Sequence, residues 1–122
     1  NFEKHMKFFI KNNKYFETPK VHDLANTNLL AFPFTIKKNK KFNRKSLLIF
    51  LEKNNIQTRV IFTGNILRQP GFKRIKHNSA YNSFPETDNV MKSGVLIGLH
   101  HGLNQTKIKY IHNKILEFLK IV

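Results

Sequence analysis

The chain has 122 residues, of which 40% are hydrophobic, enough for one domain with a hydrophobic core. It contains no cysteine, which excludes disulfides, thiolate zinc sites and cysteine-bound iron–sulfur clusters within this segment. Its formal net charge of +15 points to nucleic acid or an anionic membrane as candidate partners.

The positive charge has a second interpretation. Eighteen of the 22 basic residues are lysines, scattered as on solvated helix faces, so we do not expect nucleic acid to be the partner. A basic nucleic-acid-binding module remains the alternative function. Residues 1–4 do not resemble a secretory signal, and no apolar run approaches the ~18 residues of a membrane span. We therefore expect a cytoplasmic protein without a membrane partner, and the Asn at position 1 suggests a piece of a longer chain.

The first half of the chain predicts a helix, a loop and a strand. Residues 1–14 have apolar side chains at helical spacing. The apolar face of this helix holds Phe2, Met6, Phe9 and Ile10. Residues 17–28 are polar and predict a loop, and residues 29–37 predict a strand. The apolar face of this strand holds Leu30, Phe32, Phe34 and Ile36. Pro33 lacks a backbone donor, which favours a sheet edge or a break.

A second helix and two further strands follow. After a turn over residues 38–41, Asn43 is suited to cap a helix that ends at residues 54–55, where Asn tolerates the left-handed conformation. Its buried stripe holds Leu47, Leu48 and Leu51. Residues 57–62 predict a short strand. Residues 95–99 predict another, apolar on both faces and therefore covered on both sides.

About thirty residues between these two strands show little periodicity, which indicates a functional or disordered loop. Residues 86–92 can add one or two helical turns. The last helix begins at the N-cap Asn104. Its core stripe holds Ile108, Ile111, Ile115, Phe118, Leu119 and Val122. This order of elements predicts an α/β two-layer sandwich, with a small antiparallel or mixed sheet and helices on one face.

Few side chains suggest catalysis or metal binding. His100 and His101 are adjacent, so their rings point to opposite sides and chelate poorly; we expect one buried and one exposed ring. We expect His112, beside the last apolar stripe, to be a partly buried filler. No two acidic residues have a spacing typical of acid–base catalysis. We therefore expect no catalytic residue and no metal site in this chain.

Residues 58–70 form the one segment dense in polar functional groups. Arg59 and Arg68 are two of only four arginines, and a planar guanidinium can hold a phosphate or carboxylate bidentately. Gly64 lets the backbone approach a ligand closely, and Asn65 offers both a donor and an acceptor. Surface ion pairs of the two arginines are the alternative, and composition leaves both readings open.

The run TRVIFTGNILRQPGF, residues 58–72, resembles a signature of sugar-modifying pyridoxal phosphate (PLP) enzymes. The family is DegT/DnrJ/EryC1/StrS, in its branch related to CDP-4-keto-6-deoxyglucose 3-dehydrase of lipopolysaccharide biosynthesis. Two flanking stretches agree. The first is LAFPFTIK at residues 30–37, followed by Asn43, Arg44 and the helix to Ile56, and the second comprises residues 87–91, 97–99 and 102–104. The resemblance implies the C-terminal small domain of a fold-type I enzyme over residues 29–122. Residues 1–28 would be a linking helix and loop from a large domain that this chain lacks.

The same resemblance implies a function. The parent would be a homodimeric nucleotide-sugar 3-dehydrase or aminotransferase with PLP or PMP, acting on a nucleotide-linked deoxysugar. The large domain would hold the cofactor, so we expect this fragment to bind none and to be inactive alone. The implied substrate-binding residues are Arg59, Asn65, Arg68 and Gln69. His100 and His101 stand where relatives often have an aromatic residue or a proline. A domain that only dimerises is a third reading.

Overall fold

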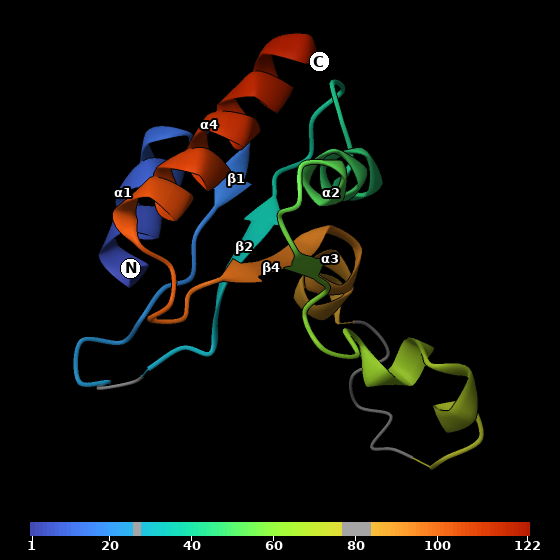
Figure 1. Ribbon diagram of the computed structural model, residues 1–122. Helices are drawn as coiled ribbons and strands as arrows, with labels where there is room; N and C mark the ends of the chain where they lie inside the picture. Colours follow the sequence, from blue (N-terminus) through green and yellow to red (C-terminus); the bar gives the residue numbers. More distant parts are fainter. Residues whose placement is uncertain (26–27, 77–83) are drawn as a thin grey trace.

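The computed structural model describes residues 1–25, 28–76 and 84–122, which form a two-layer α/β fold (Figure 1). The sheet is antiparallel and has the order β1-β2-β4-β3. The elements are α1 (Phe2–Lys11), β1 (Phe16–Glu17), β2 (Ala31–Ile36), α2 (Arg44–Lys53), β3 (Thr58–Arg59), the 3-10 turns η1 (Ile66–Arg68) and η2 (Pro70–Phe72), α3 (Pro85–Ser93), β4 (Gly94–Gly98) and α4 (Gln105–Ile121). The predicted fold class is confirmed.

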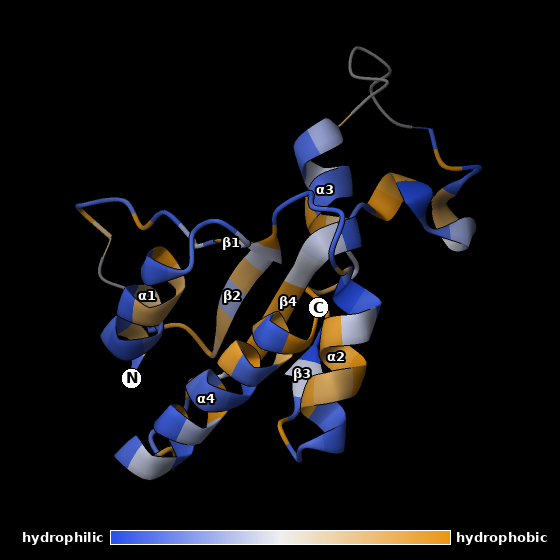
Figure 2. Cartoon of the chain, turned by 90° about the horizontal axis from the view of Figure 1, so that it is seen from above, coloured by the Kyte–Doolittle hydropathy of each residue, from blue (hydrophilic) through white to orange (hydrophobic). Residues whose placement is uncertain are grey.

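Side-chain alternation along the strands creates one covered and one open face of the sheet. On β2, Phe32, Phe34 and Ile36 are buried, as predicted. Their partners on β4, Val95 and Ile97, are buried with them. Helices α1, α2 and α4 supply the other half of this core, and Figure 2 shows the hydrophobic residues of β2, β4 and α2 gathered in the middle of the molecule.

Aromatic rings dominate the core. Phe9 of α1 is fully buried, and its ring centroid lies 4.3 Å from that of Phe34 and 5.2 Å from those of Phe16 and Phe32. Burying one such side chain contributes about 1.5–3 kcal/mol. Helix α1 is therefore bound to the sheet by an interlocking group of phenyl rings. Of the predicted faces, only Ile10 and Leu30 are wrong, because both are largely exposed.

Asparagine residues lie at the start or the end of helices, as the sequence predicts. The Asn43 side chain accepts a hydrogen bond from the backbone N–H of Ser46, and the Ser46 side chain reciprocates in a capping box. At the start of α4, the Asn104 side chain accepts a hydrogen bond from the backbone N–H of Lys107. Asn55, just past the end of α2, has φ 58°, a conformation that Asn tolerates.

The prediction of an edge position for β2 is wrong, because β2 lies between β1 and β4. The reason for that prediction, the missing backbone N–H of Pro33, still applies to one side of the strand. Strand β1 pairs only with Ile36 and Thr35 and stops short of Pro33. One side of β2 thus has no strand partner at Pro33, where a residue without an N–H is tolerated.

Three other expectations are corrected. Strand β1 lies at the start of the expected loop. The strand expected at residues 57–62 is only Thr58–Arg59, because Phe62 adopts φ 44° and cannot continue an extended strand. Strand β4 is covered by the helix layer on one face only, with Leu96 half-buried on the other. The helical turns expected at residues 86–92 are present in the nine-residue helix α3. Part of the long loop, residues 77–83, lies outside the described residues.

Two histidines form a pair that sequence patterns did not reveal. His5 of α1 is fully buried, and its Nδ1 lies 3.0 Å from Nε2 of His112 on α4. His5 Nε2 lies 3.1 Å from the carbonyl oxygen of Gly98. The ring of Phe8 stacks on His112 with centroids 4.0 Å apart. His112 is partly buried, as expected.

The expectation of one buried ring at residues 100–101 is wrong, because both His100 and His101 are exposed in the turn after β4. Within the described residues, no helix has the length and apolar character needed to cross a membrane.

Candidate functional site

The candidate site begins on the open face of the sheet. The register aligns Arg59 of β3 with Leu96 of β4, and Leu96 with Pro33 of β2, so these side chains share one face. Thr58 points the other way and is buried, where its N–H and hydroxyl both donate to Oε1 of Glu52. These two bonds lower the pKa of Glu52 and fix the end of α2 to β3. Arg59 is thereby turned to the open face.

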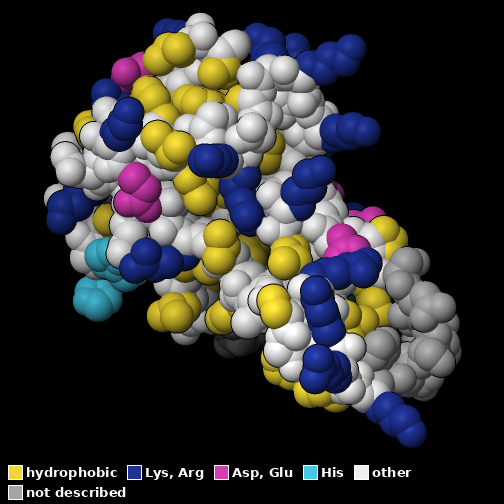
Figure 3. All heavy atoms as spheres, turned by 90° about the vertical axis from the view of Figure 1, so that its right-hand side faces the viewer, with side chains coloured by type: hydrophobic (Ala, Val, Ile, Leu, Met, Phe, Trp, Pro, Cys, Tyr) yellow, Lys and Arg dark blue, Asp and Glu magenta, His cyan; other side chains and the backbone are white. Residues whose placement is uncertain are grey.

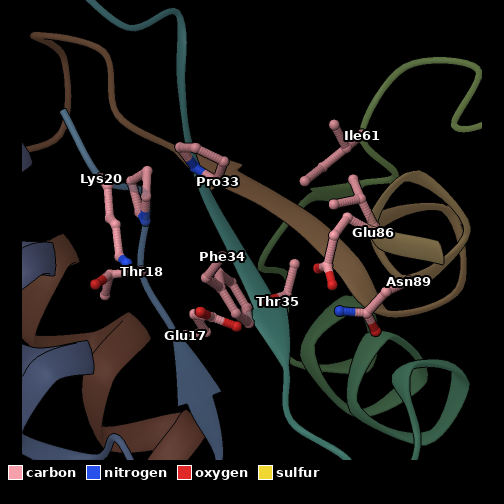
Figure 4. A pocket seen from close by; sticks show the side chains of 11 residues that line it. Glu17, Thr18, Lys20, Pro33, Phe34, Thr35, Ile61, Glu86 and Asn89 are labelled. Carbon is pink, nitrogen blue, oxygen red and sulfur yellow. The ribbon is translucent and has the colours of Figure 1, made fainter. Parts of the chain in front are cut away.

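A pocket of about 400 Å³ lies on the same face (Figure 4). Its walls come from the chain after β1, from β2, from Ile61 and from α3. Figure 4 shows Glu17 and Lys20 on one side of β2 and Glu86 and Asn89 on the other. The floor is apolar and the rim carries both charges and an amide. Such a pocket can receive a polar molecule whose one side is apolar.

The segment that follows β3 is anchored on α3 through Asn65. This side chain is 3% exposed. Its Nδ2 donates to Oδ1 of Asp88 at 2.7 Å, and its Oδ1 accepts from the N–H of Leu67 at 3.1 Å. A buried amide whose donor and acceptor are both engaged holds a loop in one conformation.

Arg68 binds the same carboxylate. Its Nε donates to Oδ1 of Asp88 at 3.1 Å and its Nη2 donates to Oδ2 at 2.8 Å, a bidentate pair. Arg68 and then Asn65 lower the pKa of Asp88. The pair lies at the surface, so its role is to orient the guanidinium rather than to stabilise the fold strongly.

The four predicted site residues thus fall into two groups. Asn65 and Arg68 meet at Asp88, and Gln69 Nε2 donates to the carbonyl oxygen of Thr63 at 2.7 Å, so these three hold their own segment in shape. Arg59 lies apart on β3: the described ranges show no hydrogen bond or short ion pair for it, but its charge is near enough to Glu52 to lower the pKa of that carboxyl slightly. The ion-pair reading therefore applies to Arg68 and not to Arg59.

Sequence reasoning missed Asp88. Its position in a helix twenty residues beyond Arg68 gives no local pattern to read. A weak signal existed: the chain has only seven acidic residues, and Asp88 lies in one of the stretches that carry the family resemblance.

The backbone between β3 and Asn65 makes a tight turn against α3. Gly64 has φ 64°, and a Cβ at this position would collide with the side chain of Met91. Its N–H donates to the carbonyl of Ile61 at 3.2 Å. The Ile61 side chain packs over Gly94, where a Cβ would displace it. Ile61 is thus turned inward, and the next residue, Phe62, is turned outward.

The lysine side chains of this chain are exposed or half-buried. All eighteen lysines lie in the described ranges, and none is buried as a Schiff-base lysine is. No group of three or more His, Cys, Asp or Glu in the same ranges could hold a metal ion. Arg59 on β3 and the pocket beside β2 are the polar features of the open face.

The sequence comparison decides the family. Residues 4–116 match the profile of the DegT/DnrJ/EryC1/StrS aminotransferase family.

The chain belongs to this family.

Two relatives are the lipopolysaccharide biosynthesis protein RfbH of Salmonella typhimurium, 31% identical over 105 residues, and a dTDP-4-dehydro-2,6-dideoxy-D-glucose 3-dehydratase of Saccharopolyspora spinosa, 34% identical over 89 residues. The matches cover 86% and 73% of this chain but 24% and 19% of the relatives. The chain therefore spans about a quarter or less of the length of these relatives.

Solved structures confirm the fold. GDP-4-keto-6-deoxy-D-mannose-3-dehydratase of E coli, with bound hydrated PLP, matches with a TM-score of 0.73 at 24% identity, over 92% of this chain and 29% of that one. A Brucella abortus member of the family matches with a TM-score of 0.74 at 12% identity, over 95% of this chain and 29% of that one. None of these relatives supports the alternative of a nucleic-acid-binding module. On the face shown in Figure 3, basic side chains are spread among hydrophobic and acidic ones.

Proposed function

We propose that this chain is the C-terminal part of a PLP-dependent nucleotide-sugar 3-dehydratase or aminotransferase in lipopolysaccharide or surface-polysaccharide biosynthesis. The family match over residues 4–116, with about three quarters of the relatives' length absent, carries this proposal. The parent is a cytoplasmic homodimer that holds PLP or PMP in its larger part. Residues 1–28 connect that larger part to residues 29–122, and within them α1 and β1 pack into the core and sheet of the small domain.

The share of this chain in the reaction is to bind substrate. Arg59 is exposed on β3 and makes no hydrogen bond or short ion pair among the described residues, so its guanidinium is available to a phosphate of a nucleotide-linked deoxysugar. Arg68, Asn65 and Gln69 shape the neighbouring loop through Asp88 and Thr63. Binding remote parts of a substrate contributes to catalysis by orientation, although the reacting atoms lie elsewhere.

The test measures nucleoside diphosphate binding by the 122-residue chain. Arg59→Gln should weaken binding roughly tenfold, because a charge-assisted hydrogen bond to phosphate is lost. Lys109→Gln is the matched control: it removes the same charge from an exposed position on α4 and should leave affinity unchanged. Equal losses in both variants would mean general charge attraction and would refute the assigned role.

A second measurement addresses the cofactor. The chain mixed with PLP and desalted should be colourless, because its lysines are exposed or only half-buried, whereas the parent should retain the group. A chain that keeps a stoichiometric chromophore would contradict the proposal. Tight binding to duplex DNA that falls steeply with salt would favour the nucleic-acid alternative instead.

A further inference from the structure

Phe62 combines two unfavourable features in one residue. Its backbone has φ 44°, in the left-handed region that bulky side chains avoid, and its ring is 84% exposed. Neither feature helps this chain to fold: the first is strained and the second leaves a large apolar surface in water. Strained residues of this kind are concentrated at ligand-binding sites, where the conformation serves contact with the ligand.

The surrounding packing holds this conformation in place. Ile61 is drawn inward by its contact over Gly94, and Gly64 closes the turn against Met91. Asn65 then fixes the segment to Asp88 at 2.7 Å. Between two anchored residues, the chain reverses direction and directs the Phe62 ring outward. The ring therefore lies on a turn whose conformation is fixed by contacts on both sides.

The chemistry beside this ring suits one class of ligand. Arg59 lies three residues earlier, on β3, and its exposed guanidinium makes no hydrogen bond or short ion pair among the described residues. An exposed phenyl ring and an exposed cation in one short segment match a planar aromatic group joined to a phosphate. A nucleobase stacks on the face of such a ring, and Arg holds the attached phosphate. Base stacking on an aromatic side chain strengthens binding by about tenfold or more.

We infer that Phe62 is the stacking surface for the base of the nucleotide-linked substrate, an inference that rests on the proposed function. The phosphate contact of Arg59 alone does not discriminate a nucleotide from inorganic pyrophosphate. The ring of Phe62 adds that discrimination, while its sequence tolerance for different bases leaves the choice of nucleotide to other contacts.

The experiment titrates the 122-residue chain with GDP and with inorganic pyrophosphate, following binding by NMR chemical shifts. GDP should bind about tenfold more tightly than pyrophosphate. Phe62→Ala should remove this advantage and leave pyrophosphate binding unchanged, whereas Phe62→Tyr should preserve it. Phe72→Ala is the matched control, since Phe72 is a 42% exposed ring in the same segment, and it should change neither affinity. Arg59→Gln should weaken both ligands.

Each other outcome has a distinct meaning. If GDP and pyrophosphate bind equally, or Phe62→Ala leaves GDP affinity unchanged while Arg59→Gln lowers it, the inference is overturned and the proposed function stands. If neither ligand binds, the phosphate-binding role and the inference fail together. If Phe62→Ala converts a dimer into a monomer in sedimentation, a second copy covers the ring and the stacking role is wrong.

Discussion

The buried His5–His112 pair predicts that mild acid destabilises this fold. The hydrogen bonds determine the proton positions: a carbonyl only accepts, so His5 Nε2 must donate to Gly98. In a neutral ring, Nδ1 of His5 then carries a lone pair and accepts from Nε2–H of His112. The native arrangement satisfies both bonds only when the two rings are neutral.

Both pKa values are displaced in the direction that favours neutral rings. Burial, and then the charge of His5, lower the pKa of His112 to about 4. Burial lowers the pKa of His5, against an opposing effect of the Gly98 hydrogen bond and with help from the charged N-terminus. The unfolded chain has ordinary histidines near pH 6.5 and binds more protons than the native state between pH 6.5 and 4. Stability is therefore full above pH 6.5 and falls as the pH drops through this window.

The magnitude follows from His112. A shift from 6.5 to about 4 corresponds to about 3 kcal/mol at ~1.4 kcal/mol per pH unit. Because the ring is only partly covered, solvent screens part of this, and we expect a loss of about 2 kcal/mol between pH 7 and pH 4.5. Below that range, loss of the carboxylate interactions of Asp88 and Glu52 adds to the effect.

Urea unfolding at pH 7, 6, 5 and 4.5 measures this loss. His112→Gln keeps a donor toward His5 but cannot titrate, so the free energy of unfolding should depend less steeply on pH. His101→Gln is the control, because this exposed ring takes no part in the pair. The reasoning would be refuted if the free energy of unfolding of His112→Gln depended on pH as steeply as that of the wild type. It would also be refuted if that dependence were reduced in His101→Gln.

Two further predictions concern the turn after β3. Gly64→Ala should destabilise the chain by about 1–3 kcal/mol, because a Cβ meets Met91 and φ is positive, while Gly71→Ala should be nearly neutral, since nothing lies within 4 Å of its Cβ. Urea unfolding of the two variants compares them, and equal stabilities would refute the tight packing described here. Phe62→Gly should stabilise the isolated chain by about 0.5–1 kcal/mol, because it relieves a left-handed backbone at the cost of added unfolded-state entropy. A large destabilisation would show that the ring packs in the fold.

The fold was predictable where local signals coincide. Asn43 and Asn104 each stand four residues before the first apolar residue of a stripe, so capping and periodicity agree on where α2 and α4 begin. The alternating phenylalanines of β2 likewise define its buried face. Strand β1 has only two residues, too short for a period to show, and the place of Pro33 depended on where β1 stops. The point at which β1 stops depends on tertiary contacts, which a local sequence pattern does not show.

The candidate site was predictable in its residues but not in its contacts. Arg59 and Arg68 were singled out together, and the structure separates them: one is exposed on the sheet and the other is bound to Asp88. The partner of Arg68 depends on how α3 docks against the turn, which no local pattern encodes. For the same reason His5 was missed, because its partner His112 lies 107 residues away.

The contact between the turn and α3 has a mechanical consequence. Ser93 is the last residue of α3 and Gly94 is the first of β4, so no loop residue separates the helix from the strand. Asn65 and Arg68 hydrogen-bond to Asp88 in the first half of α3, and the Ile61 side chain packs over Gly94, directly after the end of this helix. The turn, α3 and β4 are therefore joined by direct contacts without a flexible connection. At its other end β4 contacts α1, through the carbonyl oxygen of Gly98 and the ring of His5.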